Sequence, residues 1–304
     1  MRILFMGTPD FAKTCLQKLL NSKHEICAVY TQPDKPVGRK QKLTPSSVKV
    51  LAQEAGIPVL QPATLKTEEA AEQFRSFHPD LAVVVAYGKI LPKKFLEIPP
   101  QGCINVHASL LPKYRGAAPI QWSVLNGDKV TGVTTMFLSE GLDTGDMLLK
   151  AETSIGQNET SGELEDRLAE LGADLLLQTI EKLPNIIPQP QGEMTTAYAS
   201  MLDKTMSPID WKKDALEIHH QICGLNPWPT ASTVFEGIPL KIWKSKVIEK
   251  QKGKPGQILK DFAVCCGNGT AIQLLEVQAA GKKRMNASDF LRGHPTRTGT
   301  VLPF

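Results

Sequence analysis

The sequence predicts an α/β protein in two parts: a mostly parallel sheet with helices, followed by a small antiparallel β domain. In the first part, apolar β-branched runs alternate with stretches whose apolar residues recur at helical spacing, which is typical of βαβ units. Beyond residue 230, short apolar runs are separated by glycines, which is typical of a small barrel or sandwich. A length of 304 residues suits two domains.

The first part opens with a strand, a helix and a second strand. The run R-I-L-F-M ends at Gly7, apolar residues at helical spacing extend from Phe11 to Leu20, and E-I-C-A-V-Y-T gives the second strand. The run L-A-V-V-V-A-Y at 81–87 is continuously apolar, as expected of a central parallel strand. The other expected elements are helices at 48–55, 67–77, 120–125 and 160–184 and strands at 57–60, 103–107, 132–138 and 147–151.

Residues 32–46 stand apart from this pattern. Two proline-containing turns, one glycine and a group of cations beside Asp34 predict a long basic loop that forms no packed element. The cations of this loop are Lys35, Arg39, Lys40 and Lys42. Loops of this length are usually functional, and the alternative is a solvated insertion without a role.

The second part begins after a change in composition. Residues 188–194, P-Q-P-Q-G-E-M, are typical of a polar, proline-rich linker. A helix is expected at 214–223, and the short strands at 231–235, 238–243, 247–248, 256–260, 262–266 and 271–277. We therefore expect a first domain at 1–188, a linker at 189–208 and a C-terminal domain at 209–304.

Composition excludes several classes of protein. A hydrophobic fraction of 41% with mixed charge is that of an ordinary globular protein. No apolar run approaches the ~20 residues of a membrane span, and the N-terminus lacks the cleavage site of a signal peptide. The six cysteines show no C-x-x-C spacing, which favours reduced core thiols over metal or disulfide roles. We expect a cytoplasmic protein with no metal and no membrane partner.

Charge is unevenly distributed along the chain. From Ile209 to the end there are 14 basic and 8 acidic residues, whereas the whole chain carries 35 basic and 31 acidic residues. A basic C-terminal third on a near-neutral body indicates a polyanionic partner such as nucleic acid. A lysine-rich surface that only confers solubility explains the same count equally well.

Candidate chemistry centres on the strand at 103–107. Asn105 and His107 occupy alternate positions and therefore share one face, and Asp143 lies in a Gly-flanked turn at the same sheet edge. An amide and an imidazolium can stabilise an oxyanion, and a carboxylate can orient the histidine or take a proton. Without a nucleophile, this set suits direct transfer of an electrophilic carbon to an amine. A satisfied core histidine is the competing interpretation of His107, and Ser109 lacks the G-x-S-x-G context of a hydrolase nucleophile.

A dinucleotide cofactor is not expected. The first loop, G-T-P-D-F, lacks G-x-G-x-x-G, and Pro9 removes a backbone donor where a pyrophosphate would need one.

Several motifs together resemble one family. The stretch N-V-H-A-S-L-L-P-K-Y-R-G-A-A-P-I-Q, with D-T-G after it, is similar to the motif of folate-dependent formyltransferases. The motifs G-T-P-D-F-A, Q-P-D-K-P-V-G-R-K, I-D-W and N-P-W-P narrow the resemblance to the branch that acts on methionyl-tRNA. The resemblance covers essentially the whole chain.

The resemblance implies a function and roles for named residues. It implies a Rossmann-like first domain, an OB-like C-terminal barrel, and formyl transfer from 10-formyltetrahydrofolate to the α-amino group of methionine on initiator tRNA. It implies catalytic roles for Asn105, His107 and Asp143. It implies folate contacts at Ser109, Leu110, Leu111, Pro112, Tyr87, Gly88, Ile90 and Leu91. It implies tRNA contacts in the 32–46 loop, at Lys204 and in the C-terminal domain, where G-K-K-R contributes Lys282, Lys283 and Arg284.

Other acceptors remain open at this stage. Relatives that modify amino-sugar nucleotides share S-L-L-P-K-Y-R-G, and glycinamide ribonucleotide is another small amine acceptor. The basic loop and the basic C-terminal part favour tRNA over both. A non-catalytic tRNA-binding module is opposed by the intact Asn105, His107 and Asp143. We expect a monomer.

Overall fold

The computed structural model describes residues 1–38, 41–248, 251–296 and 299–303. The chain forms two compact units. The first unit comprises residues 1–116, 131–153 and 165–198, and the second comprises residues 117–130, 154–164 and 199–304. The segment from 189 to 198, which was expected to be a linker, therefore belongs to the first unit.

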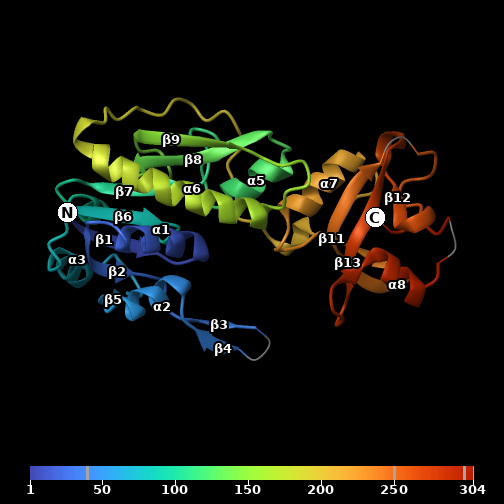
Figure 1. The fold of residues 1–304 in the computed structure, drawn as a ribbon, viewed down its shortest axis with the longest axis horizontal. Helices are drawn as coiled ribbons and strands as arrows, with labels where there is room; N and C mark the ends of the chain where they lie inside the picture. Colours follow the sequence, from blue (N-terminus) through green and yellow to red (C-terminus); the bar gives the residue numbers. More distant parts are fainter. Residues whose placement is uncertain (39–40, 249–250, 297–298, 304) are drawn as a thin grey trace. The chain divides into compact units, whose positions relative to one another are not determined.

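The first unit is built on a seven-stranded sheet with the order β5-β2-β1-β6-β7-β8-β9 (Figure 1). Its strands are β1 (Arg2–Gly7), β2 (Glu25–Tyr30), β5 (Val59–Leu60), β6 (Leu81–Val85), β7 (Cys103–His107), β8 (Val130–Phe137) and β9 (Met147–Ser154). The pairs from β5 through β7 are parallel, and β8 runs antiparallel to β7. The predicted mostly parallel, Rossmann-like sheet is confirmed.

Helices cover both faces of this sheet. The helices are α1 (Asp10–Leu20), α2 (Ser47–Glu54), α3 (Glu68–Arg75), α4 (Lys93–Leu96) and α6 (Ser161–Lys182). Phe74 of α3 and Phe95 of α4 pack with Leu4 and Met6 on one face. On the other face α6 approaches closely, because a Cβ added at Gly172 would lie 3.0 Å from Val106 Cγ1 and 3.4 Å from the ring of Phe11.

The order of the strands creates a switch point between β1 and β6. From β1 the chain passes through β2 to β5 on one side and then crosses to β6 on the other. In open α/β sheets, ligands bind outside the carboxyl ends of the strands at such a point. The segments that follow these two strand ends are 8–10 and 86–91.

The prediction of an irregular loop at 32–46 is wrong in part. Residues Lys35–Val37 form β3 and residues Lys42–Thr44 form β4, and the two pair as an antiparallel hairpin that projects from the first unit (Figure 1). The turn is possible because Gly38 and Gln41 adopt positive φ values of 72° and 48°. Pairing satisfies the backbone groups although β4 is fully exposed, so the hairpin needs no packed core.

Charged and amide groups fix the base of this hairpin. The Lys49 ammonium donates to both Asp34 carboxylate oxygens at 2.9 and 2.8 Å and to Gln61 Oε1 at 2.8 Å. Gln61 Nε2 donates back to Asp34 and to the carbonyl of Gln32, both at 2.8 Å. Hydrogen bonds from Lys49 and then Gln61 hold the pKa of the Asp34 carboxyl below its usual value.

The second unit contains a five-stranded antiparallel sheet with the order β10-β11-β13-β12, and β14 pairs with β13. Its strands are β10 (Ser232–Phe235), β11 (Ile238–Ile248), β12 (Ala263–Cys265), β13 (Ala271–Ala279) and β14 (Met285–Asn286). Its helices are α5 (Pro119–Leu125), α7 (Ala215–Gly224) and α8 (Ala287–Gly293). Trp211, Phe235, Phe262 and Phe290 are fully buried in its core.

Three details of the second unit differ from the sequence prediction. Residues 256–260 form only isolated bridges, Gln257 with Val301 and Ile258 with Val264, because Gly256 at φ 81° and a positive φ at Asp261 bend the chain on both sides. The two runs expected at 238–243 and 247–248 are one continuous strand, β11. Helix α8 was not predicted from the sequence. The OB-like character of this sheet stays a prediction.

The cysteines are placed as the sequence analysis expected of core thiols. All six cysteines are buried. Among the described residues, no helix is both long enough and apolar enough to span a membrane.

Close packing between β8 and β9 gives a test of the first unit. A Cβ added at Gly132 would lie 2.1 Å from the Ala151 carbonyl oxygen and 2.6 Å from Leu110 Cδ2. Gly132→Ala should therefore destabilise this unit by about 3 kcal/mol, which hydrogen exchange of the β8 and β9 amides would measure. Gly192→Ala is the matched control, since nothing lies within 4 Å of its added Cβ. Equal exchange rates in the two variants would contradict the packing argument.

A buried histidine links three segments of the second unit. His219 on α7 is 1% exposed, its Nε2 donates to the Gln157 carbonyl at 3.1 Å, and its Nδ1 accepts from the Ser245 hydroxyl at 2.9 Å. These roles are those of the neutral ring that carries its hydrogen on Nε2. Burial lowers the pKa of His219, with the contact to Gln157 acting in the opposite direction.

This histidine predicts a pH dependence of stability. The folded state keeps His219 neutral, whereas the unfolded chain binds a proton below about pH 6.5. The contribution of His219 to the free energy of unfolding is therefore complete above that pH. It is lost as the pH falls, by at most about 1.4 kcal/mol per pH unit. The tryptophans all lie in the second unit, so fluorescence-detected urea unfolding at several pH values reports on it.

The matched variant for this test is His219→Gln. It should be less stable than the wild type at pH 7.5 and should lose stability less steeply toward pH 5. Burial also lowers the pKa of His220, so both proteins should retain part of the decrease in stability with falling pH. Parallel pH curves for the two proteins would rule out the assigned role of His219.

Candidate active site

Strand β7 carries the first two candidate residues. Its five residues are all buried, with Asn105 8% and His107 5% exposed. Pairing of Val84 with Asn105 sets β7 beside the central strand β6 in parallel register. Because alternate side chains of a strand share a face, Asn105 and His107 lie on the same side of the sheet, as predicted.

His107 contacts the protein through both ring nitrogens. Nε2 lies 3.0 Å from the Tyr114 carbonyl oxygen, and Nδ1 lies 3.8 Å from Asp143 Oδ1. A carbonyl oxygen can only accept, so Nε2 carries a hydrogen. The Tyr114 carbonyl therefore occupies Nε2–H, while Nδ1 faces the Asp143 carboxylate at a distance longer than a hydrogen bond. Donation from a protonated His107 to an oxyanion stays a prediction.

Asp143 is held in a constrained turn between β8 and β9. Its φ of 52° lies in the left-handed region, and the residue is 9% exposed. Carboxylate oxygen Oδ2 accepts from the Gly116 amide at 2.9 Å, which turns Oδ1 toward His107. The structure thus brings together the predicted residues His107 and Asp143, which are distant in sequence.

The loop after β7 is rigidly braced. The Ser109 hydroxyl is fully buried and donates to the Lys113 carbonyl at 2.6 Å. Thr134 Oγ1 donates to the Ser109 carbonyl at 2.7 Å and accepts from the Leu111 amide at 3.1 Å. The Lys150 ammonium donates to the Leu111 carbonyl at 2.6 Å. Ser109 therefore contacts no base, which argues against a hydrolase nucleophile.

Sequence reasoning missed these supporting residues. Thr134 is buried on β8 and Lys150 is exposed on β9, and in the sequence both look like ordinary polar residues of a strand. Within the predicted folate segment, Leu111 is buried and Leu110 and Pro112 are partly exposed.

The other predicted folate segment follows β6. Tyr87 is 1% exposed and its ring packs in the sheet core, while its carbonyl accepts from Thr8 Oγ1 at 3.2 Å and from Gln32 Nε2 at 3.0 Å. Gly88 is exposed at φ 82°, Ile90 is 71% exposed, and Leu91 is buried. Ile90 is thus the apolar side chain of this segment that is open to a ligand.

The predicted tRNA contacts are exposed but belong to both units. Lys35 and Lys42 are exposed on the hairpin, and Arg39 and Lys40 lie outside the described residues. Lys204, Lys282 and Lys283 are exposed in the second unit. Arg284 differs, because its guanidinium pairs with Glu276 and lies 4.2 Å from the ring of Trp243.

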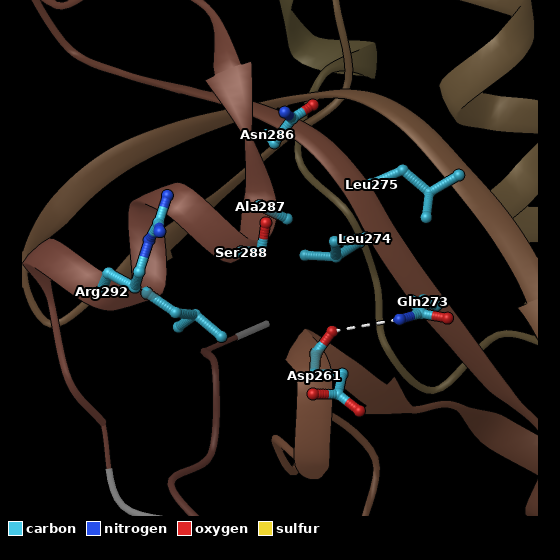
Figure 2. Close-up of a pocket in the computed structure, with 9 residues that line it drawn as sticks. Asp261, Gln273, Leu274, Leu275, Asn286, Ala287, Ser288 and Arg292 are labelled. Atoms are coloured by element: carbon cyan, nitrogen blue, oxygen red, sulfur yellow. Dashed lines mark hydrogen bonds between the residues drawn. The ribbon is translucent and has the colours of Figure 1, made fainter.

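A separate hollow of about 660 Å³ lies in the second unit (Figure 2). It is lined by Asp261, Gln273, Leu274, Leu275, Asn286, Ala287, Ser288, Leu291 and Arg292. Gln273 Nε2 donates to the Asp261 carbonyl at 3.3 Å, and the lining contains none of the candidate catalytic residues. Within the described ranges, no group of three or more His, Cys, Asp or Glu side chains could hold a metal.

The strap from Gln189 to Tyr198 also reaches the site. Gln191 Nε2 donates to the carbonyl of Asp143, and Tyr114 donates its amide to Thr196 Oγ1 at 2.8 Å. No sequence pattern marked these residues, since a side chain that binds a backbone carbonyl leaves no motif.

Comparison with known proteins agrees with this geometry. The formyl transferase family model matches residues 1–180, and the model of the formyl transferase C-terminal domain matches residues 201–295. The methionyl-tRNA formyltransferase of Trichlorobacter lovleyi is 52% identical, covering 99% of this chain and 96% of that protein. The methionyl-tRNA formyltransferase of Alkaliphilus oremlandii is 50% identical, covering 99% of each.

Solved structures show the same fold. An N-formyltransferase from Helicobacter canadensis, solved with folinic acid and dTDP-3-aminofucose, superposes with a TM-score of 0.69 at 22% identity. The match covers 92% of this chain and 99% of that one. At this identity the likeness is one of fold. The identity over nearly the whole length to the curated relatives is much higher, and the chain belongs to the methionyl-tRNA formyltransferase family.

Proposed function

We propose that this enzyme transfers a formyl group from 10-formyltetrahydrofolate to the α-amino group of methionine on initiator methionyl-tRNA. The observation that carries the proposal is the buried contact of His107 Nδ1 with Asp143, beside Asn105 on the same strand face. The hydroxyl nearest in sequence, that of Ser109, is bound to a carbonyl, so a covalent intermediate on the protein is not invoked. Family membership supports the same reaction.

The residues suit direct attack by the amine. The α-amino nitrogen adds to the formyl carbon and forms the new C–N bond, while the formyl oxygen gains negative charge. The Asn105 side-chain amide donates to that oxygen, and the pair of His107 and Asp143 takes the proton that the amine releases. Collapse of the intermediate breaks the bond to the folate nitrogen, which accepts a proton as it leaves.

The donor site is assigned to two segments at the strand ends. Ser109–Pro112 follows β7 and residues 87–91 follow β6, and the parallel register of these strands places the two segments side by side. A flat heterocycle needs rigid backbone groups and an apolar contact. The braced carbonyls of Ser109 and Leu111 and the exposed side chain of Ile90 offer these. The folate is thus a co-substrate bound by backbone and apolar groups.

The exposed lysines of the hairpin and the second unit support tRNA as the acceptor of the formyl group. Lys35 and Lys42 project on the exposed hairpin, and Lys204, Lys282 and Lys283 are exposed on the second unit, where they suit contacts with phosphates. We further propose that residues 189–208 connect the two domains, the part up to Tyr198 packing with the first unit, and that the enzyme acts as a monomer. Because charged tRNA is the acceptor, we place the reaction in the cytoplasm.

An assay with charged initiator tRNA and 10-formyltetrahydrofolate tests this function. The wild-type protein should form formylmethionyl-tRNA, and a parallel reaction with a dTDP-linked amino sugar should give no product. Product with the sugar alone would move the acceptor to a small amine. Absence of product with both acceptors would overturn the enzymatic proposal.

Removing either member of the buried pair should abolish most of the chemistry. His107→Ala and Asp143→Ala should each lower kcat for formyl transfer by about 10²- to 10⁴-fold, because proton transfer and its orientation are lost. Binding of tRNA, measured by filter retention, should stay within about threefold of the wild type. A loss of tRNA affinity as large as the loss of rate would make these binding residues instead.

Charge on the hairpin should govern binding of the acceptor. Replacing Lys35 and Lys42 by Gln should raise KM for methionyl-tRNA and lower the slope of log K against log salt concentration by about 1 to 2. The control is Lys23→Gln, a change at an exposed lysine between α1 and β2. An unchanged salt slope in the hairpin variant would exclude the hairpin from phosphate contacts.

A further inference from the structure

The strap from Gln189 to Tyr198 is attached to the first unit at three points. The backbone of Gln189 exchanges two hydrogen bonds of 2.8 Å with Met147 at the start of β9. Gln191 contacts the Asp143 turn, and Thr196 accepts from the Tyr114 amide at 2.8 Å. A segment with the composition of a polar, proline-rich linker is therefore anchored beside the candidate active site.

The central attachment is the side-chain amide of Gln191. Its Nε2 donates to the carbonyls of Asp143 at 2.9 Å and Gly145 at 2.8 Å. Its Oε1 accepts from Arg115 Nε at 2.8 Å, and Arg115 Nη2 donates to the Gly192 carbonyl at 3.0 Å. The Gln191 amide therefore binds two loops, the Asp143 turn through Nε2 and the loop that contains Arg115 through Oε1.

These two loops supply every protein contact described above for the His107 ring. The Asp143 turn provides the carboxylate that faces Nδ1, and the loop that contains Arg115 provides the Tyr114 carbonyl that accepts from Nε2. The same loop provides the Gly116 amide that binds Asp143 Oδ2. Gln191 therefore joins the two loops between which the imidazole is held.

The Asp143 turn needs such support. A non-glycine residue in the left-handed region costs about 1 kcal/mol or more and persists only when its surroundings hold it there. The turn also packs tightly, since a Cβ added at Gly145 would lie 1.8 Å from the Phe137 carbonyl oxygen. Hydrogen bonds to the carbonyls of Asp143 and Gly145 fix the backbone on both sides of Thr144.

We propose that Gln191 is a positioning residue for formyl transfer: it ties the Asp143 turn to the Tyr114–Gly116 loop and so sets the carboxylate against His107. This inference rests on the proposed function. Gln191 touches neither reacting group directly, so it acts through Asp143. Its loss changes the geometry of proton transfer and leaves the binding segments at 87–91 and on the hairpin in place.

Two variants of Gln191 test the inference in steady-state formyl transfer. Gln191→Ala removes the whole amide, and Gln191→Glu keeps an acceptor for Arg115 but sets an oxygen against the carbonyls of Asp143 and Gly145. Both variants should lower kcat by about 10- to 100-fold, the range expected when a catalytic group is displaced. KM for methionyl-tRNA and for the folate should stay within about threefold of the wild type.

Gln189→Ala is the matched control on the same strap. Its exposed side chain is removed while its backbone pairing with Met147 is unchanged, so its kcat should equal that of the wild type. The amount of folded protein is measured for each variant by circular dichroism and active-site titration, so that lower stability is not counted as lower kcat.

The pH–rate profile separates positioning from a structural role. Among the described groups, His107 and the nearby Tyr198 are the titratable side chains that interact with Asp143. Partial burial, and then the charge on Asp143, raises the pKa of Tyr198, which keeps the phenol neutral at neutral pH. Because the geometry of proton transfer changes, the pH–rate profile should shift in both Gln191 variants and stay unchanged in Gln189→Ala.

Each outcome bears on one of the two proposals. Lower kcat with unchanged KM and a shifted pH limb supports the positioning role. Wild-type kcat in Gln191→Ala, or a loss that matches the unfolded fraction with an unshifted pH profile, overturns it. Absence of formyl transfer by the wild-type protein overturns the proposed function instead.

Discussion

The buried contact between His107 and Asp143 is the interaction on which the rest of the site depends. The two side chains are 6% and 11% exposed, and their facing atoms are 3.8 Å apart. Charges placed in such surroundings are costly unless hydrogen bonds compensate for lost water. The backbone amide of Gly116 and the carbonyl of Tyr114 provide this compensation, one for each partner. The loops that carry these groups must therefore be held as firmly as the pair itself.

The sheet explains why the pair can be held there. Parallel pairing with β6 fixes Asn105 and His107 at the end of a fully buried strand, where the backbone has little freedom. The antiparallel strand β8 then sets Thr134 opposite His107 in register, and its hydroxyl braces the loop that begins at Ser109. A rigid framework under a short polar loop is the arrangement that positions catalytic groups within fractions of an ångström.

The sequence predicted the parts of the site that follow a period or a motif. Alternation along β7 placed Asn105 and His107 on one face, and a Gly-flanked turn indicated Asp143. The sequence could not predict Gln191, because it lies 48 residues from Asp143 and binds a carbonyl that every residue possesses. The hairpin at 35–44 was missed for a related reason. Its strands have three residues each and β4 is fully exposed, so β4 carries no buried side chain that would impose an alternating pattern on the sequence.

The hydrogen bond of His107 to the Tyr114 carbonyl determines which ring nitrogen faces Asp143. Since Nε2–H is used by the Tyr114 carbonyl, a neutral ring presents the lone pair of Nδ1 to the Asp143 carboxylate, and two acceptors then face each other. The imidazole is therefore fixed by the protein through Nε2, and its Nδ1 edge is the one that faces the carboxylate. In the proposed reaction the oxyanion is stabilised by Asn105, whose side chain shares this face of the strand.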